Sequence, residues 1–422
     1  MSQNLRVNLS RLWSTIMSSA EIGRTEAGGL RRLALSAEDG AVRRLLQRWC
    51  EEAGLVVSVD AMGNMFARRE GRNPDARAIL MGSHLDTQIH GGRFDGVLGV
   101  LGALEVIRSL NDHGIETDHP LVLVNWTNEE GARFEPPMIG SKVFCGLQDA
   151  QDVHRIVDRD GIRFGDALAE IGFLGPDRIS PESIDSYFEL HIEQGPELYE
   201  RKIQVAAVHG AFDVRWAVVE VRGDNAHAGP TRMADRRNAL VGAAAVINAV
   251  NEIGWAYAPS GGRTTSARLS VEPNLLGIIS HRAEVLCDFR HPEKGIPQHM
   301  LDSFISRLPE LEARSNCGIS IARSWQYGAV DYDPGMTELV RSAARDLGYS
   351  QMDLLTVAGH DSMYLAGIVP STMIFTPCEK GISHNEAENC TPEDIEPGVN
   401  VLLHAVLKRD RQAGVSRSAG TS

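Results

Sequence analysis

The sequence predicts an α/β protein with a layered, mainly parallel sheet that is interrupted by an inserted α+β unit. Three segments, Ala78–Met81, Leu121–Trp126 and Tyr187–Ile192, are largely apolar and carry polar residues at or just after their ends. A helical pattern, Val97–Leu110, lies between the first two segments. Continuously apolar strands that alternate with helices are typical of a parallel sheet covered by helices.

The residues before this sheet predict two helices and a hairpin. Leu9–Met17 has the spacing of one amphipathic helix and lacks the continuous apolar core of a signal peptide. The stretch Ser36–Asp39 has the pattern of a capping box, which begins the next helix. Val56–Val59 and Asn64–Arg69 are typical of two strands around a turn.

The pattern changes near residue 212 and changes back near residue 330. Val214–Val221 alternates like a half-exposed strand, and Asn238–Ile253 is a long amphipathic helix. We therefore expect residues 1–211 and 329–422 to form one catalytic domain and residues 212–328 to be inserted into it. The remaining expected elements are strands at Ala267–Val271, Glu284–Arg290 and Val369–Phe375, helices at Leu301–Arg314 and Gly335–Leu347, and a final helix after a cap at Thr391–Asp394.

Composition restricts the kind of partner. The 422 residues carry a net charge of −14, which argues against nucleic acid or an anionic membrane as the main partner. The sequence has no run of about 18 apolar residues that would span a membrane. Its six cysteines are scattered without a CxxC pair, which is typical of reduced thiols, and we expect a cytoplasmic protein.

The most informative stretch is residues 81–96, MGSHLDTQIHGGRFDG. The preceding strand places His84 and Asp86 at its carboxyl end, where open α/β sheets bind ligands. Glycines 91, 92 and 96 let the chain turn tightly around Asp95. A histidine and acids in such a loop are suitable ligands for zinc, manganese or cobalt, although an ordinary βα loop with a surface histidine is the alternative.

Further histidines and acids fall at the ends of other predicted strands. His84, Asp95, Glu130, His191 and His384 together suit a two-metal site in which one carboxylate, Asp95, bridges the ions.

Two more acids have possible roles beside these ligands. Asp86 is suited to fix the tautomer of a ligand imidazole from outside the metal's own shell. Glu129 is free to act as general base and acid, and a solvated acidic pair is the alternative for Glu129 and Glu130.

Several motifs carry a resemblance to a known family. The chain contains GSHLDT, GGRFDGVLGV, TNEEGARF, GSKVFCG, ELHIEQGPELY, HAGPT, GHD and GISHNEAE, in that order. Between about Leu33 and Leu407 it resembles the hydantoinase/carbamoylase branch of the di-metal amidohydrolase and aminopeptidase superfamily. That branch includes N-carbamoyl-L-amino-acid hydrolases, β-ureidopropionases and allantoate amidohydrolases.

The resemblance implies a di-metal hydrolase core with two divalent ions (Zn, Mn or Co) and a small-molecule substrate. One ion would be held by His84, Asp95 and His191, and the other by Asp95, Glu130 and His384. A hydroxide that bridges the ions would attack the carbonyl of a linear amide, and Glu129 would move the proton to the leaving nitrogen.

The resemblance also implies roles outside the metal ligands. The inserted unit would be a lid that forms a homodimer and presents His227 to the oxyanion, in the active site of the partner subunit. Gln194 would face the amide or ureido group, while Arg290 and Asn274 would bind the substrate carboxylate. The alternatives are a lid-loop histidine for His227, a solvated or ion-paired charge for Arg290 and a turn cap for Asn274.

The chain departs from the branch's pattern at three places. Gly277 stands where a second carboxylate-binding asparagine is usual, Ala226 replaces the asparagine before the lid histidine, and Arg232 is new to its motif. None of these is a metal ligand, so the expected hydrolysis is unaffected and the substrate side chain is left open. A dipeptidase or aminoacylase of the same superfamily is the alternative activity. A catalytically silent binding protein would have no chemical need for all five ligands and Glu129.

Overall fold

The computed structural model of the chain describes residues 4–177 and 179–418, and these form two compact units. Unit 1 contains the chain up to Gly210 and again from Asp331, and unit 2 contains Ala211–Val330. Each unit has its own buried apolar cluster. The functional assignment of unit 2 as a lid stays a prediction.

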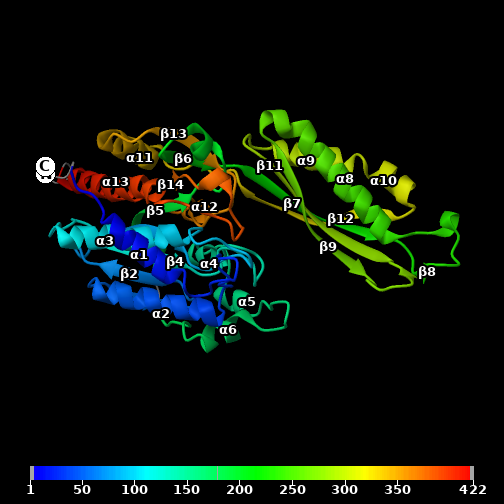
Figure 1. The fold of residues 1–422 in the computed structure, drawn as a ribbon, viewed down its shortest axis with the longest axis horizontal. Coiled ribbons are helices and arrows are strands. Elements are labelled where there is room, and N and C mark those ends of the chain that lie inside the picture. The colour runs from blue at the N-terminus through cyan, green and yellow to red at the C-terminus, as the bar shows by residue number, and fades with distance from the viewer. Residues whose placement is uncertain (1–3, 178, 419–422) are drawn as a thin grey trace. The chain divides into compact units, whose positions relative to one another are not determined.

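Unit 1 is built on an eight-stranded sheet with the strand order β1-β2-β4-β3-β5-β14-β6-β13 (Figure 1). The four central strands β4, β3, β5 and β14 are mutually parallel, whereas β1, β2 and β6 pair with their neighbours in antiparallel fashion. The expected layered and mainly parallel α/β core is therefore confirmed. The strands are β1 Val56–Val59, β2 Met65–Arg69, β3 Ala78–His84, β4 Leu121–Trp126, β5 Ile184–Ile192, β6 Val205–Ala211, β13 Gln351–Thr356 and β14 Ser371–Thr376.

Helices cover both faces of this sheet. Apolar side chains of β3 and β5 pack with α1, α3 and α13 on one face, and Phe144 of α4 and Leu365 of α12 join the cluster on the other. The helices are α1 Leu9–Ser19, α2 Ala37–Glu52, α3 Val97–Asp112, α4 Ile139–Phe144, α5 Ala150–His154, α6 Phe164–Glu170, α7 Glu197–Arg201, α11 Pro334–Leu347, α12 Ser362–Leu365 and α13 Pro392–Ser418, with short 3₁₀ turns at Pro181–Ser183 and Glu379–Gly381.

Several helices begin where the sequence predicts, at residues whose side chains cap the first helical turn. The Ser36 side chain accepts the Asp39 N–H at the start of α2, and the Asp39 carboxylate accepts the Leu35 N–H in return. Asn238 caps α8 in the same way through the N–H of Leu240. Each cap satisfies a backbone donor that the first helical turn leaves without a partner.

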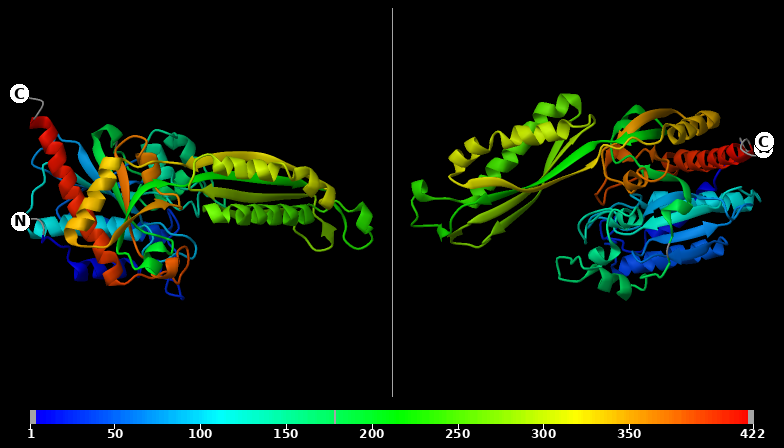
Figure 2. Two further views of the ribbon diagram at one scale, coloured as in Figure 1. Left: turned by 90° about the horizontal axis from the view of Figure 1, so that it is seen from above. Right: turned by 180° about the vertical axis from the view of Figure 1, so that it is seen from behind.

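Unit 2 is a four-stranded antiparallel sheet, in the order β12-β7-β11-β9, with a separate two-stranded pair of β8 and β10. Figure 2 shows helices running along this sheet. The elements are β7 Asp213–Arg222, β8 Ala226–His227, α8 Ala239–Tyr257, β9 Arg263–Glu272, β10 Ile278–Ile279, β11 Arg282–His291, α9 Ile296–Ile305, α10 Leu308–Ser315 and β12 Gly318–Gly328, with 3₁₀ turns at Met233–Asp235 and Ala258–Ser260.

The prediction of one continuous helix in this part of unit 2 is wrong. The sequence predicts a single helix over Leu301–Arg314, but the structure has α9 ending at Ile305 and α10 beginning at Leu308. Pro309 lies in the first turn of α10, where its missing N–H leaves no hydrogen bond unmade. A proline inside one continuous helix would have removed such a bond, so the chain breaks there instead.

Among the described residues, one helical stretch, Ala239–Ser260, is long and apolar enough to cross a membrane by those two criteria alone. Its inner face, with Ala243, Val246 and Val250, belongs to the core of unit 2. A core helix meets the same criteria, so length and composition are weak evidence for a span here.

Candidate metal centre

The central parallel strands of unit 1 all bring polar side chains to their carboxyl ends. His84 is the last residue of β3, His191 lies next to the end of β5, and Glu130 follows β4. The loop after β14 brings His384 to the same place, and the loop after β3 contributes Asp95. This convergence follows from the parallel direction of the four strands.

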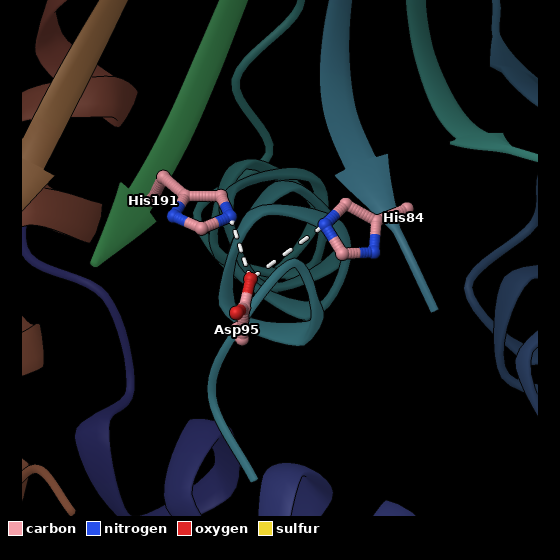
Figure 3. A group of neighbouring side chains, drawn as sticks. All are labelled: His84, Asp95 and His191. Carbon is pink, nitrogen blue, oxygen red and sulfur yellow. Dashed lines mark ion pairs between the residues drawn. The ribbon is translucent and has the colours of Figure 1, made fainter. Parts of the chain in front are cut away.

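Three of these side chains form a buried group, His84, Asp95 and His191, whose ligand atoms all lie within 4.8 Å of one another (Figure 3). The Oδ1 atom of Asp95 is 3.1 Å from Nε2 of His191 and 3.7 Å from Nε2 of His84. In Figure 3 the two imidazoles approach from separate strands and both face the Asp95 carboxylate. Two imidazole nitrogens and one carboxylate oxygen make a suitable half-site for a transition metal.

The tautomer of His84 is set by a main-chain contact. Nδ1 of His84 lies 2.9 Å from the carbonyl oxygen of Asp86, and a carbonyl accepts a hydrogen bond only from a protonated nitrogen. Nε2 is therefore left with its lone pair towards Asp95. Nδ1 of His191 makes the equivalent contact with the carbonyl of Ile192, at 2.9 Å.

The role of Asp86 differs from the one that the sequence predicts. Its carboxylate oxygen is 3.9 Å from Nδ1 of His84, beyond hydrogen-bond distance, and the carbonyl orients the ring instead. The Asp86 carboxylate accepts the N–H groups of Glu129 and Glu130, at 3.3 and 3.2 Å. Asp86 thus fixes the segment that carries both glutamates.

A second group contains Asp95, Glu130 and His384, and it shares Asp95 with the first. Nε2 of His384 is 3.3 Å from Oδ2 of Asp95 and 3.3 Å from Oε2 of Glu130. The His384 side chain is 49% exposed, so this group opens to solvent whereas the first group is buried. Gln88 holds both carboxylate oxygens of Glu130 from the other side.

The tight packing of the first group depends on a glycine. Gly96 has φ +67°, and a Cβ atom there would lie 2.4 Å from Cε1 of His84. Three non-glycine residues around the site, Asn128, Gln194 and His384, also have positive φ between 51° and 58°. Such backbone conformations are uncommon outside glycine and gather at functional sites.

Glu129 lies beside the first group without belonging to it. It is buried, and its Oε2 is 3.4 Å from Nε2 of His84. Burial, followed by the negative charges of Asp361 and Glu130, raises the pKa of Glu129 well above its usual value. A raised pKa favours the protonated carboxyl group, which is suited to donating a proton in general acid–base chemistry.

The electrostatics of the ligands favour bound cations. Burial raises the pKa of Glu130 to about 8, with a further contribution from the charge of Asp95. Burial also opposes ionisation of Asp95, but its close contacts with the His191 and His384 imidazoles outweigh burial and hold the pKa of Asp95 well below its usual value. Burial lowers the pKa of His84 to about 4, so this imidazole is neutral and available as a ligand. The donor set fits two divalent ions such as zinc, manganese or cobalt.

Gln194 is also brought into the site. Its Nε2 donates to Oδ2 of Asp95 at 3.0 Å and to Ser383 Oγ at 3.2 Å. Its Oε1 is buried and has no hydrogen-bond partner among the described residues. A buried carbonyl oxygen without a donor is expected to accept one from a bound molecule.

The other three predicted site residues belong to unit 2. His227 is an exposed residue of β8, and its Nδ1 accepts the Gly229 N–H at 3.1 Å. Asn274 lies in the exposed turn between β9 and β10. Arg290 of β11 is ion-paired with Asp288 at 2.8 Å and stacks over Trp216. The roles of these residues towards the metal centre stay predictions.

Two residues that the sequence motifs did not single out also contact the site. Ser383 donates to Oδ2 of Asp95 at 3.1 Å, and Glu388 accepts the N–H groups of Phe94 and Asp95. Both lie in the motif GISHNEAE, so their nearness to His384 was the available signal. His360 is also buried beside the site, with its ring centroid 4.5 Å from that of His191.

Comparison with known proteins agrees with this geometry. The model of peptidase family M20/M25/M40 matches residues 80–408. The chain is 42% identical over 406 residues to an N-carbamoyl-L-amino-acid amidohydrolase of Rhizobium meliloti, covering 96% of this chain and 97% of that protein. It is 31% identical over 400 residues to a ureidoglycolate hydrolase of Oryza sativa subsp. japonica, covering 90% and 80%.

Solved structures lead to the same family. An amidase of the hydantoinase/carbamoylase family from Burkholderia vietnamiensis is 44% identical, with a TM-score of 0.92 over 97% of this chain and 99% of that one. A similar amidase from Burkholderia multivorans is 45% identical, with a TM-score of 0.83 over 96% and 98%. The chain therefore belongs to peptidase family M20/M25/M40 and, within it, is a hydrolase of the hydantoinase/carbamoylase amidase branch.

Proposed function

We propose that this protein hydrolyses the linear C–N bond of an N-carbamoyl amino acid or a related ureido acid in a metal-dependent reaction. The observation that carries the proposal is the pair of ligand groups that share Asp95, with Glu129 directly beside them. The names of the relatives support the substrate class, because they include N-carbamoyl-L-amino-acid amidohydrolases and ureidoglycolate hydrolases.

Each of the two ligand groups would hold one divalent ion. His84, Asp95 and His191 would bind one ion, and Asp95, Glu130 and His384 the other, with zinc, manganese or cobalt as candidates. When bound, such a pair supplies a nucleophile from water at neutral pH and polarises the carbonyl that is attacked.

Glu129 would act as the proton carrier. It would take the proton that water loses on attack and give it to the nitrogen that leaves as the C–N bond breaks. Its raised pKa matches this role, because a raised pKa favours the protonated carboxyl group that gives its proton to the leaving amine. With an N-carbamoyl amino acid and one water, the products are the amino acid, carbon dioxide and ammonia.

Recognition of the substrate would use residues outside the two metal-ligand groups. The free Oε1 of Gln194 would accept an N–H of the ureido group. Arg290, whose orientation is fixed by Asp288, would bind the carboxylate with help from Asn274, and His227 would stabilise the oxyanion. Gly277 leaves this carboxylate end with one polar side chain fewer than the branch usually has.

We further propose a homodimer formed through unit 2, with His227 entering the partner's site. The outer face of α8 supports this, because Leu240, Val241 and Trp255 are exposed there. A cytoplasmic location is supported by the six free cysteines, most of them buried.

The substrate proposal is tested by assaying protein loaded with Zn²⁺, Mn²⁺ or Co²⁺ on N-carbamoyl amino acids, ureido acids, N-acetyl amino acids and dipeptides. Ammonia release from a carbamoyl or ureido substrate is the expected result. Cleavage of only N-acetyl amino acids or dipeptides would show an aminoacylase or dipeptidase instead. Metal binding without hydrolysis of any of these compounds would contradict the proposed function.

A further inference from the structure

The segment 383–389 brings a buried carboxylate to the metal centre in addition to His384. Glu388 is 1% exposed, and its Oε1 accepts the N–H of Phe94 at 2.9 Å and that of Asp95 at 3.1 Å. Its Oε2 lies 3.4 Å from Ser383 Oγ. Neither metal ligation nor proton transfer as proposed for this site uses the buried Glu388 carboxylate.

The loop after β3 is shaped to receive this carboxylate. A Cβ atom on Gly92 would lie 2.0 Å from both Cδ and Oε1 of Glu388, a distance that real contacts do not allow. The glycine therefore serves a close approach between the loop and Glu388. This close approach places the Glu388 carboxylate within hydrogen-bond distance of the N–H groups of Phe94 and Asp95.

These contacts join two segments that are far apart in the sequence. Asp95 comes from the loop after β3, and His384 comes from the segment that also carries Glu388. Ser383 strengthens the connection through its hydrogen bond to Oδ2 of Asp95. Asp95 and His384 both belong to the second ligand group. They stay close to each other only if the two segments stay in contact.

The two ligand groups differ in what else holds them. In the first group all three side chains are buried, and His84 and His191 come from neighbouring strands of the sheet. In the second group His384 is half exposed and lies in a loop with φ +51°. Loss of the Glu388 contact would therefore affect the second group more than the first.

We propose that Glu388 is a positioning residue that fixes the main chain of Asp95 against the segment of His384 and so determines retention of the second metal ion. This inference rests on the metal site of the proposed function but not on the identity of the substrate. The side chain acts as a hydrogen-bond acceptor, and both of its amide contacts are made by the single atom Oε1.

The test is a titration of chelator-treated protein with Co²⁺, followed by calorimetry and by visible absorption of the bound ion. The variants are Glu388→Ala, Glu388→Met and Glu388→Gln, with Glu386→Ala as the matched control. Glu386 lies in the same segment, but its carboxylate contacts His90, 3.5 Å away, in place of the Asp95 main chain. Methionine has a similar length to glutamate without a strong acceptor, and therefore tests the contact if the alanine variant does not fold.

We expect the parent and Glu386→Ala to bind two equivalents of Co²⁺. Glu388→Ala and Glu388→Met should keep one equivalent and bind the other about 10- to 100-fold more weakly, which is the usual effect of losing a partner that orients metal ligands. The absorption of the second ion should change, because its ligand geometry changes. Glu388→Gln should bind like the parent, since its Oε1 can accept the same two amide groups.

Three results would overturn the inference: unchanged affinity for both ions in Glu388→Ala and Glu388→Met, equal weakening in Glu386→Ala, or equal weakening in Glu388→Gln. Failure of the parent itself to bind two ions would instead contradict the metal site on which the proposed function depends. The two failures are therefore distinguished by the parent titration.

Discussion

Replacing Glu129 by glutamine separates its proposed proton transfer from metal binding. Glutamine has the same shape, but its amide cannot take up the proton that water loses. Glu129 is not a member of either ligand group, so the Glu129→Gln protein should still bind two ions. General acid–base catalysis contributes about 10²- to 10⁴-fold, so kcat should fall by this factor, roughly 3–5 kcal/mol of barrier, with little change in KM.

The neighbouring glutamate provides the matched control. Glu130 contributes a ligand atom to the second group, so Glu130→Gln should lose affinity for one ion as well as activity. Both variants are measured by metal content after dialysis and by ammonia release from the best ureido substrate. The reasoning is refuted if metal-loaded Glu129→Gln is as fast as the parent, or if its metal content falls like that of Glu130→Gln.

The same substitution has an effect on stability whose sign follows from the pKa. The folded state holds the pKa of Glu129 well above its unfolded value, so the folded protein binds a proton that the unfolded chain has lost. This contribution is present at low pH and is lost as the pH rises through the folded pKa. In the presence of chelator, Glu129→Gln should therefore gain stability relative to the parent as the pH rises, as measured by urea unfolding.

Three further predictions concern the scaffold. Arg43→Met leaves the carboxylate of Asp39 buried without its ion-pair partner 2.9 Å away, and should lower the free energy of unfolding in urea by about 3–5 kcal/mol. An unchanged midpoint would show that the pair is not structurally important. Gly96→Ala adds a Cβ atom 2.4 Å from His84 and should lower affinity for the first metal ion, with calorimetric titration of the folded variant as the check. Trp255→Asp places a charge on the exposed face of α8 and should convert a dimer into monomers in sedimentation experiments; a parent that is already monomeric with full activity would contradict the proposed interface.

The sequence was informative about the ligands because each one lies at the end of a recognisable apolar strand or in a loop with a strong local signal. His84 follows the run Ala78–Met81, and Glu130 follows Leu121–Trp126. The carboxyl ends of parallel strands meet at one edge of the sheet, so the strand pattern alone groups residues that are distant in the chain. His384 lies farther from its strand than the other ligands do, but its place in the segment after Val369–Phe375 already grouped it with them.

Contacts made by main-chain atoms could not be predicted in the same way. The sequence gives no sign that His84 is oriented by the carbonyl of Asp86 while the carboxylate of Asp86 turns to the N–H groups of two glutamates. The role of Glu388 is hidden for the same reason, because its partners are amide groups of the main chain, which the side-chain pattern does not reveal.

Two of the strands that the sequence did not reveal are incompletely buried. Strand β13, Gln351–Thr356, lies at the edge of its sheet, and most of its residues are partly exposed, so no continuous apolar run marks it. Strand β12, Gly318–Gly328, is a largely exposed edge strand of unit 2 and was missed for the same reason.

Anomalous diffraction from crystals of the protein grown with Mn²⁺ or Zn²⁺ tests the central claim most directly. We predict two peaks about 3.5–4 Å apart, one bonded to His84, Asp95 and His191 and the other to Asp95, Glu130 and His384. A single peak, or peaks that do not share Asp95, would contradict the two-metal centre on which the proposed function rests.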